Sequence, residues 1–403
     1  MHTLRLPLYC KKFFYTPHHA SRFRFSPLCL CLLLAALLGG CRESGGFILF
    51  FDDQPDLWDG TIAAGFSGGS GSAADPYRIH MSTQLAYLAR QVTNGTTYAG
   101  SHFILTRNLN LNGREWTTIG TNTVRFAGTF DGNNHVIHNL SINKSATSYQ
   151  GLFGCLDGAT IQELGLENVS ITGGYYVGGV AGQVTGGSSI VNSYSTGTVS
   201  GTGYVGGVAG QVTGGGDIAN SYSTGNVSGT DECVGGVAGS VTGGGGIANS
   251  YSTGDVSGIG HVGGVAGEVT GGIADSYSTG TVGGNYCVGG VAGSVASGSS
   301  IEHCAALNPW VKATTNNAGR VVGFILGGTF PGNVAWDSMS TNGGIPFTTN
   351  PDNTGTGITT TQVKDGTGLP SALKTAPWSY TPGKLPVLSG LAGQTGALPG
   401  HLQ

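Results

Sequence analysis

A glycine-rich phrase, Val-Gly-Gly-Val-Ala-Gly, recurs five times in the middle of the chain. The copies begin at Val177, Val205, Val234, Val262 and Val288, at spacings of 28, 29, 28 and 26 residues. A phosphate-binding loop needs one copy, and a flexible linker needs no fixed period. Each unit contains three short β-prone runs separated by glycine and shows no helical periodicity. This pattern predicts that each unit forms one coil of a right-handed parallel β-helix.

The second half of each unit reads Ile-x-Asn-Ser-Tyr-Ser-Thr-Gly-x-Val, with aspartate replacing asparagine in the last copy. Stacked coils place equivalent residues about 4.8 Å apart, so we expect ladders of like side chains. The expected ladders are Asn192, Asn220, Asn249 and Asp275, which can hydrogen-bond at a turn, and Tyr194, Tyr222, Tyr251 and Tyr277, whose rings can stack. Thr196, Thr224, Thr253 and Thr279 form a further rank, interpreted as closing a turn. The valines that open the units are expected to fill a narrow core.

The pattern weakens on both sides of the regular units. Divergent coils are expected at 103–121, 126–142 and 149–173, and the period is lost after Cys304. Ser82 is expected to be the N-cap of a short helix that covers the open N-terminal end of the stack. The sequence therefore predicts an all-β protein. It is a right-handed parallel β-helix, or solenoid, of about nine rungs with a short N-terminal capping helix and an irregular C-terminal cap.

The N-terminal segment has the features of an export signal. A basic stretch precedes an apolar run at 28–38, which is too short to span a bilayer as a helix, and Leu-Gly-Gly-Cys follows at 38–41. This arrangement resembles the lipobox of bacterial lipoproteins. The resemblance implies that Cys41 is acylated, with palmitate among its acyl groups, and anchors the chain to a membrane. An ordinary secretory signal with an incidental Cys41 is the alternative, and in both cases the mature chain leaves the cytoplasm.

These observations give an expected organisation along the chain. It consists of a lipoprotein signal peptide at 1–40, a lipid anchor and tether at 41–68, an N-terminal cap at 69–102, the repeat β-helix at 103–305, and C-terminal rungs with a cap at 306–403. Trp58 and Phe66 are the residues of the tether that could dock on the domain.

The charge distribution excludes one class of partner. Without residues 1–40 the chain has 12 basic and 21 acidic residues, a net charge of −9, and residues 145–311 contain no lysine or arginine. Nucleic-acid binding depends on neutralising phosphates with those residues, so we expect no nucleic-acid partner. The remaining cysteines, Cys155, Cys233, Cys287 and Cys304, lack any paired spacing and do not form a disulfide framework.

Several segments together resemble a known family. "GSGSAADPYRIHMSTQLAYLA", "FDGNNHVIHNLSI", "GLFG" and the "VGGVAG…NSYSTGxVSG" units are similar to bacterial surface proteins with GLUG-motif repeats, over roughly residues 58–390. The resemblance implies a β-helix and an adhesin-like role at the cell surface. Such repeats also occur in large exported proteins of unknown role and beside the catalytic part of some immunoglobulin-A-cleaving peptidases. Val-Ala replaces the usual Leu-Val here, which suggests a slimmer core.

No enzymatic site is expected from the residues. No His-Glu-x-x-His string is present, so the zinc site of a metallopeptidase is not predicted. A hydrolase needs two carboxylates within about 5 to 10 Å. The candidates are Asp217, Asp231, Glu232, Asp255, Glu268 and Asp275. Asp255 shares its rank with threonine and asparagine, and Glu268 with glutamine and serine, which indicates solvated positions that vary freely.

A metal site is not expected either. Cys233, His261 and Cys287 share one rank, preceded by Tyr176 and Tyr204. These side chains at about 4.8 Å spacing could in principle bind zinc. We interpret the rank as a position that tolerates side chains of medium size, and we expect no metal and no cofactor.

The sequence thus favours a non-enzymatic cell-envelope lipoprotein. It would bind glycans or proteins of a host or bacterial surface along the β-helix, in the manner of an adhesin. Arg42 after Cys41 is not the aspartate associated with inner-membrane retention, which favours an outer-membrane lipoprotein facing the surface. A structural spacer without a ligand, or a carbohydrate-active β-helix enzyme, is the alternative.

Overall fold

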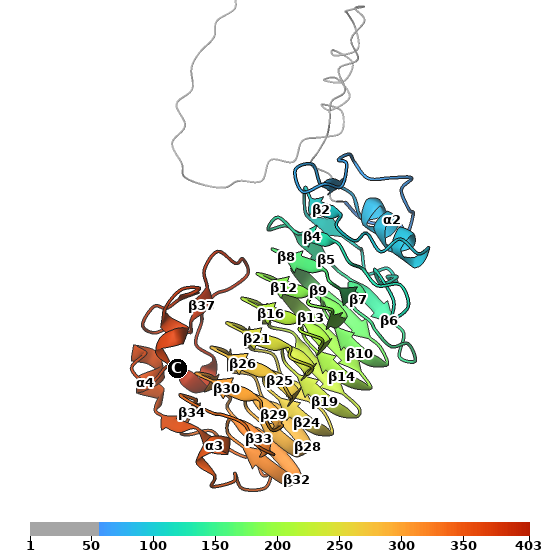
Figure 1. The fold of residues 1–403 in the computed structure, drawn as a ribbon. Helices are drawn as coiled ribbons and strands as arrows, with labels where there is room; N and C mark the ends of the chain where they lie inside the picture. The colour runs from blue at the N-terminus through green and yellow to red at the C-terminus, as the bar shows by residue number, and fades with distance from the viewer. Residues whose placement is uncertain (1–55) are drawn as a thin grey trace, which may run out of the picture. The chain divides into compact units, whose positions relative to one another are not determined.

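The computed structural model describes residues 56–403, which belong to one compact unit. The predicted signal peptide at 1–40 and the predicted lipidation site Cys41 lie outside the described residues. The unit is a right-handed parallel β-helix of about nine turns, as the sequence predicts (Figure 1). No helix of residues 56–403 combines the length and the apolar character needed to cross a bilayer.

Each regular turn contributes strands to three parallel sheets. The nine-stranded sheet consists of β1 (Tyr77–Ile79), β2 (His102–Leu105), β4 (Thr129–Asp131), β8 (Thr160–Gln162), β12 (Ser189–Val191), β16 (Asp217–Ala219), β21 (Gly246–Ala248), β26 (Gly272–Ala274) and β30 (Ser300–Glu302). The seven-stranded sheet consists of β7 (Phe153–Asp157), β11 (Ala181–Thr185), β15 (Ala209–Val212), β20 (Ala238–Val241), β25 (Ala266–Val269), β29 (Ala292–Val295) and β33 (Val322–Ile325).

The third sheet has 19 strands and carries the tyrosine ladder. Its strands are β3 (Leu109–Asn110), β5 (Val136–His138), β6 (Ser141–Asn143), β9 (Gly165–Thr172), β10 (Tyr175–Gly178), β13 (Tyr194–Gly201), β14 (Gly203–Gly206), β17 (Tyr222–Ser223), β18 (Asn226–Gly229), β19 (Glu232–Gly235), β22 (Tyr251–Ser252), β23 (Val256–Ser257), β24 (Gly260–Gly263), β27 (Tyr277–Ser278), β28 (Val282–Gly289), β31 (Ala305–Ala306), β32 (Val311–Gly319), β34 (Val334–Trp336) and β35 (Thr356–Ile358).

Equivalent residues of successive turns lie in register. Val205 pairs with Val234, and Tyr222 pairs with Tyr251. The valines that open the units are completely buried and fill the core, as expected. Glycine is required where backbones approach closely. A Cβ at Gly267 would lie 2.6 Å from both the His261 carbonyl oxygen and the Val234 nitrogen. Close approaches of this kind account for part of the high glycine content.

The helix α2 (Ser82–Thr93) lies at the N-terminal end, but Ser82 is not its N-cap, contrary to the prediction. Met81 occupies that position, and the Gln84 side chain accepts hydrogen bonds from the backbone nitrogens of His80 (2.7 Å) and Met81 (3.0 Å). Ser82 is the first helical residue. Its backbone nitrogen donates to the Asp56 carboxylate at 2.6 Å, so a contact with a preceding segment replaces the expected cap.

In place of a tether, residues 56–68 pack on the domain. Trp58 is 7% exposed, and its ring meets that of Trp116 edge to face with centroids 5.4 Å apart. Phe66 packs against the rings of Tyr77 and Phe103 at 4.8 and 5.4 Å. The docking considered for Trp58 and Phe66 therefore takes place, and the folded domain begins no later than Asp56.

The C-terminal region adds rungs and then runs back along the side of the stack. Strands β32 to β35 extend the β-helix, and Asn353 of α3 (Pro351–Thr354) donates to the Val322 carbonyl of β33 at 2.7 Å. The remaining elements are α4 (Thr360–Asp365), η1 (Ser371–Lys374), β36 (Trp378–Ser379), β37 (Val387–Leu388) and η2 (Gly400–Leu402).

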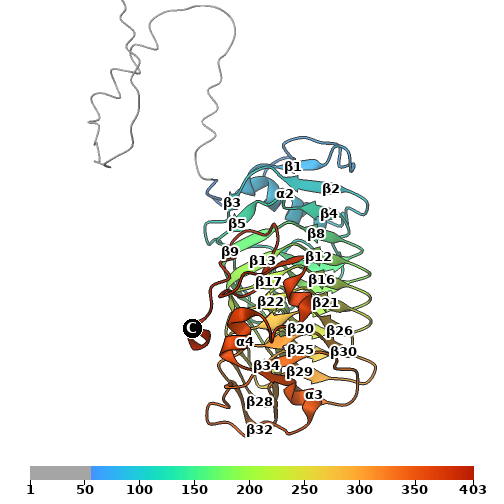
Figure 2. The same cartoon turned by 90° about the vertical axis from the view of Figure 1, so that its left-hand side faces the viewer.

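We call residues 378–402 the C-terminal strap. Figure 2 shows the red C-terminal elements lying across the stacked rungs. The predicted rungs after Cys304 are present, but much of the predicted end cap is in fact a covering of one side face.

Candidate functional site: a cleft under the C-terminal strap

The four tyrosines of the predicted ladder form a continuous stack. Neighbouring ring centroids are 4.8, 4.9 and 4.8 Å apart, with interplanar angles of 1°, 8° and 3°. All four side chains are buried. Burial raises the pKa of the Tyr222, Tyr251 and Tyr277 hydroxyls, so these groups stay protonated and act as hydrogen-bond donors.

Three of these hydroxyls hold the strap. The hydroxyl of Tyr222 donates to the Ala392 carbonyl at 2.6 Å, and that of Tyr277 donates to the Pro386 carbonyl at 2.8 Å. Between them, the Tyr251 hydroxyl donates to the Gln394 side-chain oxygen at 3.1 Å. At the first tyrosine of the ladder the pattern changes, because the Tyr194 hydroxyl donates to the Glu167 carboxylate at 2.9 Å instead.

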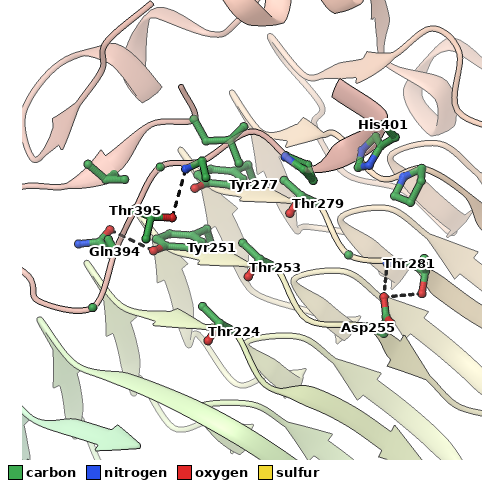
Figure 3. A pocket seen from close by; sticks show the side chains of 18 residues that line it. Thr224, Tyr251, Thr253, Asp255, Tyr277, Thr279, Thr281, Gln394, Thr395 and His401 are labelled. Carbon is green, nitrogen blue, oxygen red and sulfur yellow. Dashed lines mark hydrogen bonds between the residues drawn. The ribbon is translucent and has the colours of Figure 1, made fainter. Parts of the chain in front are cut away.

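The strap and the third sheet enclose a cleft of about 340 Å³ (Figure 3). The β-helix side of the cleft consists of Thr224, Tyr251, Thr253, Asp255, Tyr277, Thr279, Gly280, Thr281 and Pro309, and the strap side of Leu385, Val387, Gly393, Gln394, Thr395, Gly396, Ala397, Pro399 and His401. Three members of the predicted threonine rank thus line a cleft, a role that the sequence interpretation did not give them.

The polar groups of the cleft suit recognition by hydrogen bonds. Asp255 is the single carboxylate in the lining, and its Oδ1 accepts from the hydroxyl (2.6 Å) and the backbone nitrogen (2.9 Å) of Thr281. His401 Nε2 donates to the Leu307 carbonyl at 2.8 Å, and burial lowers the pKa of the ring. Since a neutral imidazole then presents an acceptor at Nδ1, the lining offers threonine hydroxyls and acceptors to a polyhydroxylated ligand.

The predicted asparagine rank occupies a turn with left-handed backbone. The φ angles of Asn192, Asn220, Asn249 and Asp275 lie between 48° and 51°. The side chain of Asn220 donates to that of Asn192 at 3.2 Å, whereas Asp275 lies 3.3 Å from His303 Nδ1. Asparagine tolerates this backbone conformation better than most residues, which explains its repetition here.

Three of the candidate carboxylates, Asp231, Glu232 and Glu268, lie near the Cys233 thiol, whose pKa is raised by burial and also by these charges, and each accepts a hydrogen bond from a different residue. Asp231 accepts from the Tyr175 hydroxyl at 3.2 Å, and Glu232 accepts from the Tyr286 hydroxyl. Glu268 accepts from the Cys233 thiol at 3.7 Å.

The rank of Glu268 differs from the prediction. Ser240 in that rank is completely buried, so the rank is not solvated throughout. Asp255 is exposed, as expected for its rank.

The Cys233, His261 and Cys287 rank also adopts positive φ, at 63°, 48° and 52°. His261 Nδ1 lies 2.6 Å from the Ser294 hydroxyl, and Cys287 accepts from Asn317 at 3.6 Å. Within residues 56–403 no three His, Cys, Asp or Glu side chains converge on a point that could hold a metal ion. The four cysteines of this region are free and buried.

Two features escaped the sequence interpretation. The first is the set of strap contacts, which join residues more than 100 positions apart, so no local sequence pattern predicts them. The second is an asparagine ladder in the divergent coils, where Asn139 donates to Asn110 at 2.9 Å and Asn168 donates to Asn139 at 2.6 Å. These asparagines recur at a spacing of 29 residues, so aligning the divergent coils could have found them.

The fold and the ladders define a β-helix repeat protein, and comparison shows that its repeats carry the GLUG motif. The motif matches residues 173–200, 201–228, 230–257 and 284–312. The intervening coil, 258–283, continues the same three sheets through β24, β25, β26 and β27.

Two curated relatives share part of the chain. Halomucin of Haloquadratum walsbyi is 32% identical over 168 residues, which are 39% of this chain and 2% of halomucin. A "Putative Gly-rich membrane protein" of Evansella cellulosilytica is 34% identical over 117 residues, 27% of this chain and 12% of that protein. The chain therefore matches only a small part of either relative's length.

One solved structure has a similar fold. A crystal structure of a "putative immunoglobulin A1 protease" from Bacteroides ovatus superposes with a TM-score of 0.58 at 22% sequence identity. The match covers 80% of this chain and 95% of that one. At this identity the likeness concerns the fold alone.

Proposed function

We propose that the protein is a non-enzymatic, lipid-anchored cell-envelope protein that binds neutral glycans, in the manner of an adhesin, in the cleft under the C-terminal strap. The observation that carries the proposal is the lining of the cleft, where threonine hydroxyls and the His401 ring surround a space of about 340 Å³. Sugars present many hydroxyls, each able to donate and accept, and such a lining can pair with them.

The charges of the cleft support recognition over hydrolysis. Glycoside hydrolysis by the common mechanism uses two carboxylates, and Asp255 has no second carboxylate beside it in the lining. Lysine and arginine are absent from the lining as well, so the cleft suits a neutral ligand. The predicted export signal and the predicted lipidation of Cys41 support an envelope location, and one relative is named a membrane protein.

A glycan array probed with the purified full-length protein tests this proposal. We expect binding to a neutral glycan, and we expect the double variant Thr253→Val/Thr279→Val to bind at least about tenfold more weakly, because two hydroxyls are lost without a change of shape. Thr230→Val is the matched control, since Thr230 is exposed and lies outside the cleft lining.

The other outcomes separate the alternatives. If no glycan binds, the proposal fails and a structural spacer becomes the better account. If a bound glycan is cleaved during incubation, the protein is a carbohydrate-active enzyme. If both variants bind like the wild type, the glycan site lies elsewhere on the β-helix.

A further inference from the structure

A second cavity, of about 370 Å³, lies at the N-terminal end of the β-helix, apart from the strap. It is formed between α2 and the segments around Trp58 and Trp116. Its lining consists of Trp58, Gly60, Ile62, Ala86, Ala89, Arg90, Thr93, Arg114, Glu115, Trp116 and Thr117. Its size is within the range of small-molecule sites. None of these residues belongs to the GLUG-motif repeats or to the strap cleft.

Neither arginine of this cavity forms an ion pair with a carboxylate within residues 56–403, and Arg114 has a minor electrostatic interaction with Asp59. Arg90 Nη2 donates to the Ala63 carbonyl at 3.2 Å, and Arg114 Nε donates to the Trp58 carbonyl at 3.0 Å. Arg78 and Arg125 differ, because they form ion pairs with Asp75 and Asp157 at 2.8 and 3.4 Å. Each lining arginine therefore keeps guanidinium donors for a bound anion.

The single acid in the lining does not cancel this charge. The Glu115 carboxylate lies 3.6 Å from the Lys144 ammonium and also accepts from the Asn143 backbone nitrogen at 3.1 Å. Outside the lining, the Asp59 carboxylate accepts from the Thr61 hydroxyl at 2.6 Å, which is the main reason that its pKa is lowered, and the charge of Arg114 makes the smallest contribution. The cavity therefore has a positive character in a chain whose overall charge is negative.

The rest of the lining is divided between an apolar floor and a polar rim. Trp58, Ala86 and Ala89 are buried and supply the floor. Thr93 and Thr117 are exposed and supply hydroxyls at the rim. A pyranose ring has an apolar C–H face and an edge of hydroxyls, which match a floor and a rim of this kind. An acyl chain or an aromatic acid would use the floor and the arginines but leave the rim unpaired.

We propose that this cavity binds a single acidic sugar unit of the hexuronate class, with its carboxylate held by Arg90 and Arg114 and its ring on the Trp58 floor. The site is independent of the cleft proposed for neutral glycans. It would give the protein a second, charge-selective contact at the N-terminal end of the β-helix.

Titration of the purified full-length protein with methyl β-glucuronide tests the site, with calorimetry as the readout and tryptophan fluorescence as a second one. We expect the glucuronide to bind and the neutral methyl β-glucoside to bind at least about tenfold more weakly, since a charge-assisted hydrogen bond contributes at least that factor. Arg90→Gln and Arg114→Gln should each weaken glucuronide binding about tenfold. Arg125→Gln, which changes a half-buried arginine outside the cavity, should leave glucuronide binding unchanged.

Each contrary result overturns the proposal. Equal affinities for glucuronide and glucoside would show that the arginines do not select an anion. Tighter binding of octanoate in competition would identify an acyl-carboxylate site instead. No binding, or binding unaffected in both arginine variants, would show that the cavity is not the site. Unchanged melting temperatures of the arginine variants exclude unfolding as the cause of a loss of glucuronide binding. The Thr253→Val/Thr279→Val variant should bind glucuronide with the affinity of the wild type.

Discussion

The hydroxyl of Tyr222 donates a 2.6 Å hydrogen bond to the backbone carbonyl of Ala392, 170 residues later in the chain. This contact joins the most regular part of the β-helix to the least regular part of the sequence. Because Tyr251 and Tyr277 make equivalent contacts one and two rungs further on, the tyrosine ladder serves both as a stack and as the attachment of the strap. The shape of the cleft therefore depends on these hydroxyls.

Tyr222→Phe should loosen the strap while keeping the ring stack. The variant loses one hydrogen bond and leaves the Ala392 carbonyl unpaired, so we expect the free energy of unfolding to fall by about 1 kcal/mol. Amide hydrogen exchange around residue 392 should also become faster. Tyr175→Phe is the control. Tyr175 is 40% exposed, so the loss of its hydroxyl should have little effect on the free energy of unfolding or on exchange around residue 392. Identical exchange in wild type and Tyr222→Phe would contradict this attachment.

The attachment of the strap should weaken at acidic pH through His401. Burial lowers the pKa of this ring in the folded state below its ordinary value of 6.5, so the neutral form is favoured there. When the strap is detached, the His401 ring is exposed to water and takes up a proton more readily. The contribution of neutral His401 to the attachment of the strap is therefore complete above about pH 6.5 and decreases as the pH falls below that value. Limited proteolysis of the strap at pH 7.5 and 5.5 measures this effect, and His401→Gln should reduce the pH dependence. An unchanged dependence in that variant would assign it to other groups.

Gly267→Ala should destabilise the β-helix strongly. The new Cβ would lie 2.5 to 2.6 Å from the Gly239 and His261 carbonyl oxygens and the Val234 nitrogen, all of them backbone atoms that cannot move away cheaply. We expect a loss of at least about 2 kcal/mol in thermal or urea unfolding. Gly272→Ala is the matched control, since its Cβ would meet nothing closer than the Ser300 hydroxyl at 3.4 Å. Equal stability of the two variants would show that close approach does not require Gly267.

Substitutions of Asn249 test whether the left-handed backbone of the turn explains the asparagine at this position. Its φ is 48°, and its side chain makes no hydrogen bond to another residue in the part of the chain that the structure describes. Asn249→Val should therefore reduce stability by about 1–2 kcal/mol, mainly through backbone strain. Asn249→Gly should cost much less in the same unfolding measurement, because glycine adopts this conformation freely. A larger loss for glycine than for valine would refute the backbone explanation.

The repeat made the fold predictable. A fixed period and near-identical units determine which residues stack, so the buried valines and the tyrosine stack followed from alignment alone. The Ser82 prediction failed because the cap depends on Gln84 and on a contact with Asp56, 26 residues earlier. The spacing rules that predict a local cap do not include such partners.

The candidate site was much less predictable. Its threonines were visible as a rank, but Gln394 and His401 lie in a segment without a period. Their places depend on hydrogen bonds from Tyr251 to Gln394 and from His401 to Leu307, which connect positions far apart in the chain. The tyrosine ladder offered the only hint, since a row of buried hydroxyls requires acceptors from another segment.

The central claim is that the protein faces outward from the cell envelope. Its surface exposure on intact cells tests this claim most directly. An epitope inserted between Asn342 and Gly343, which form an exposed turn, avoids the buried Leu402 at the end of the strap. Protease is added to intact cells that produce the protein, with a periplasmic protein as the control for lysis. The account predicts that the epitope is removed while the control protein stays intact. An epitope that survives until the envelope is broken would contradict an outward-facing, adhesin-like protein.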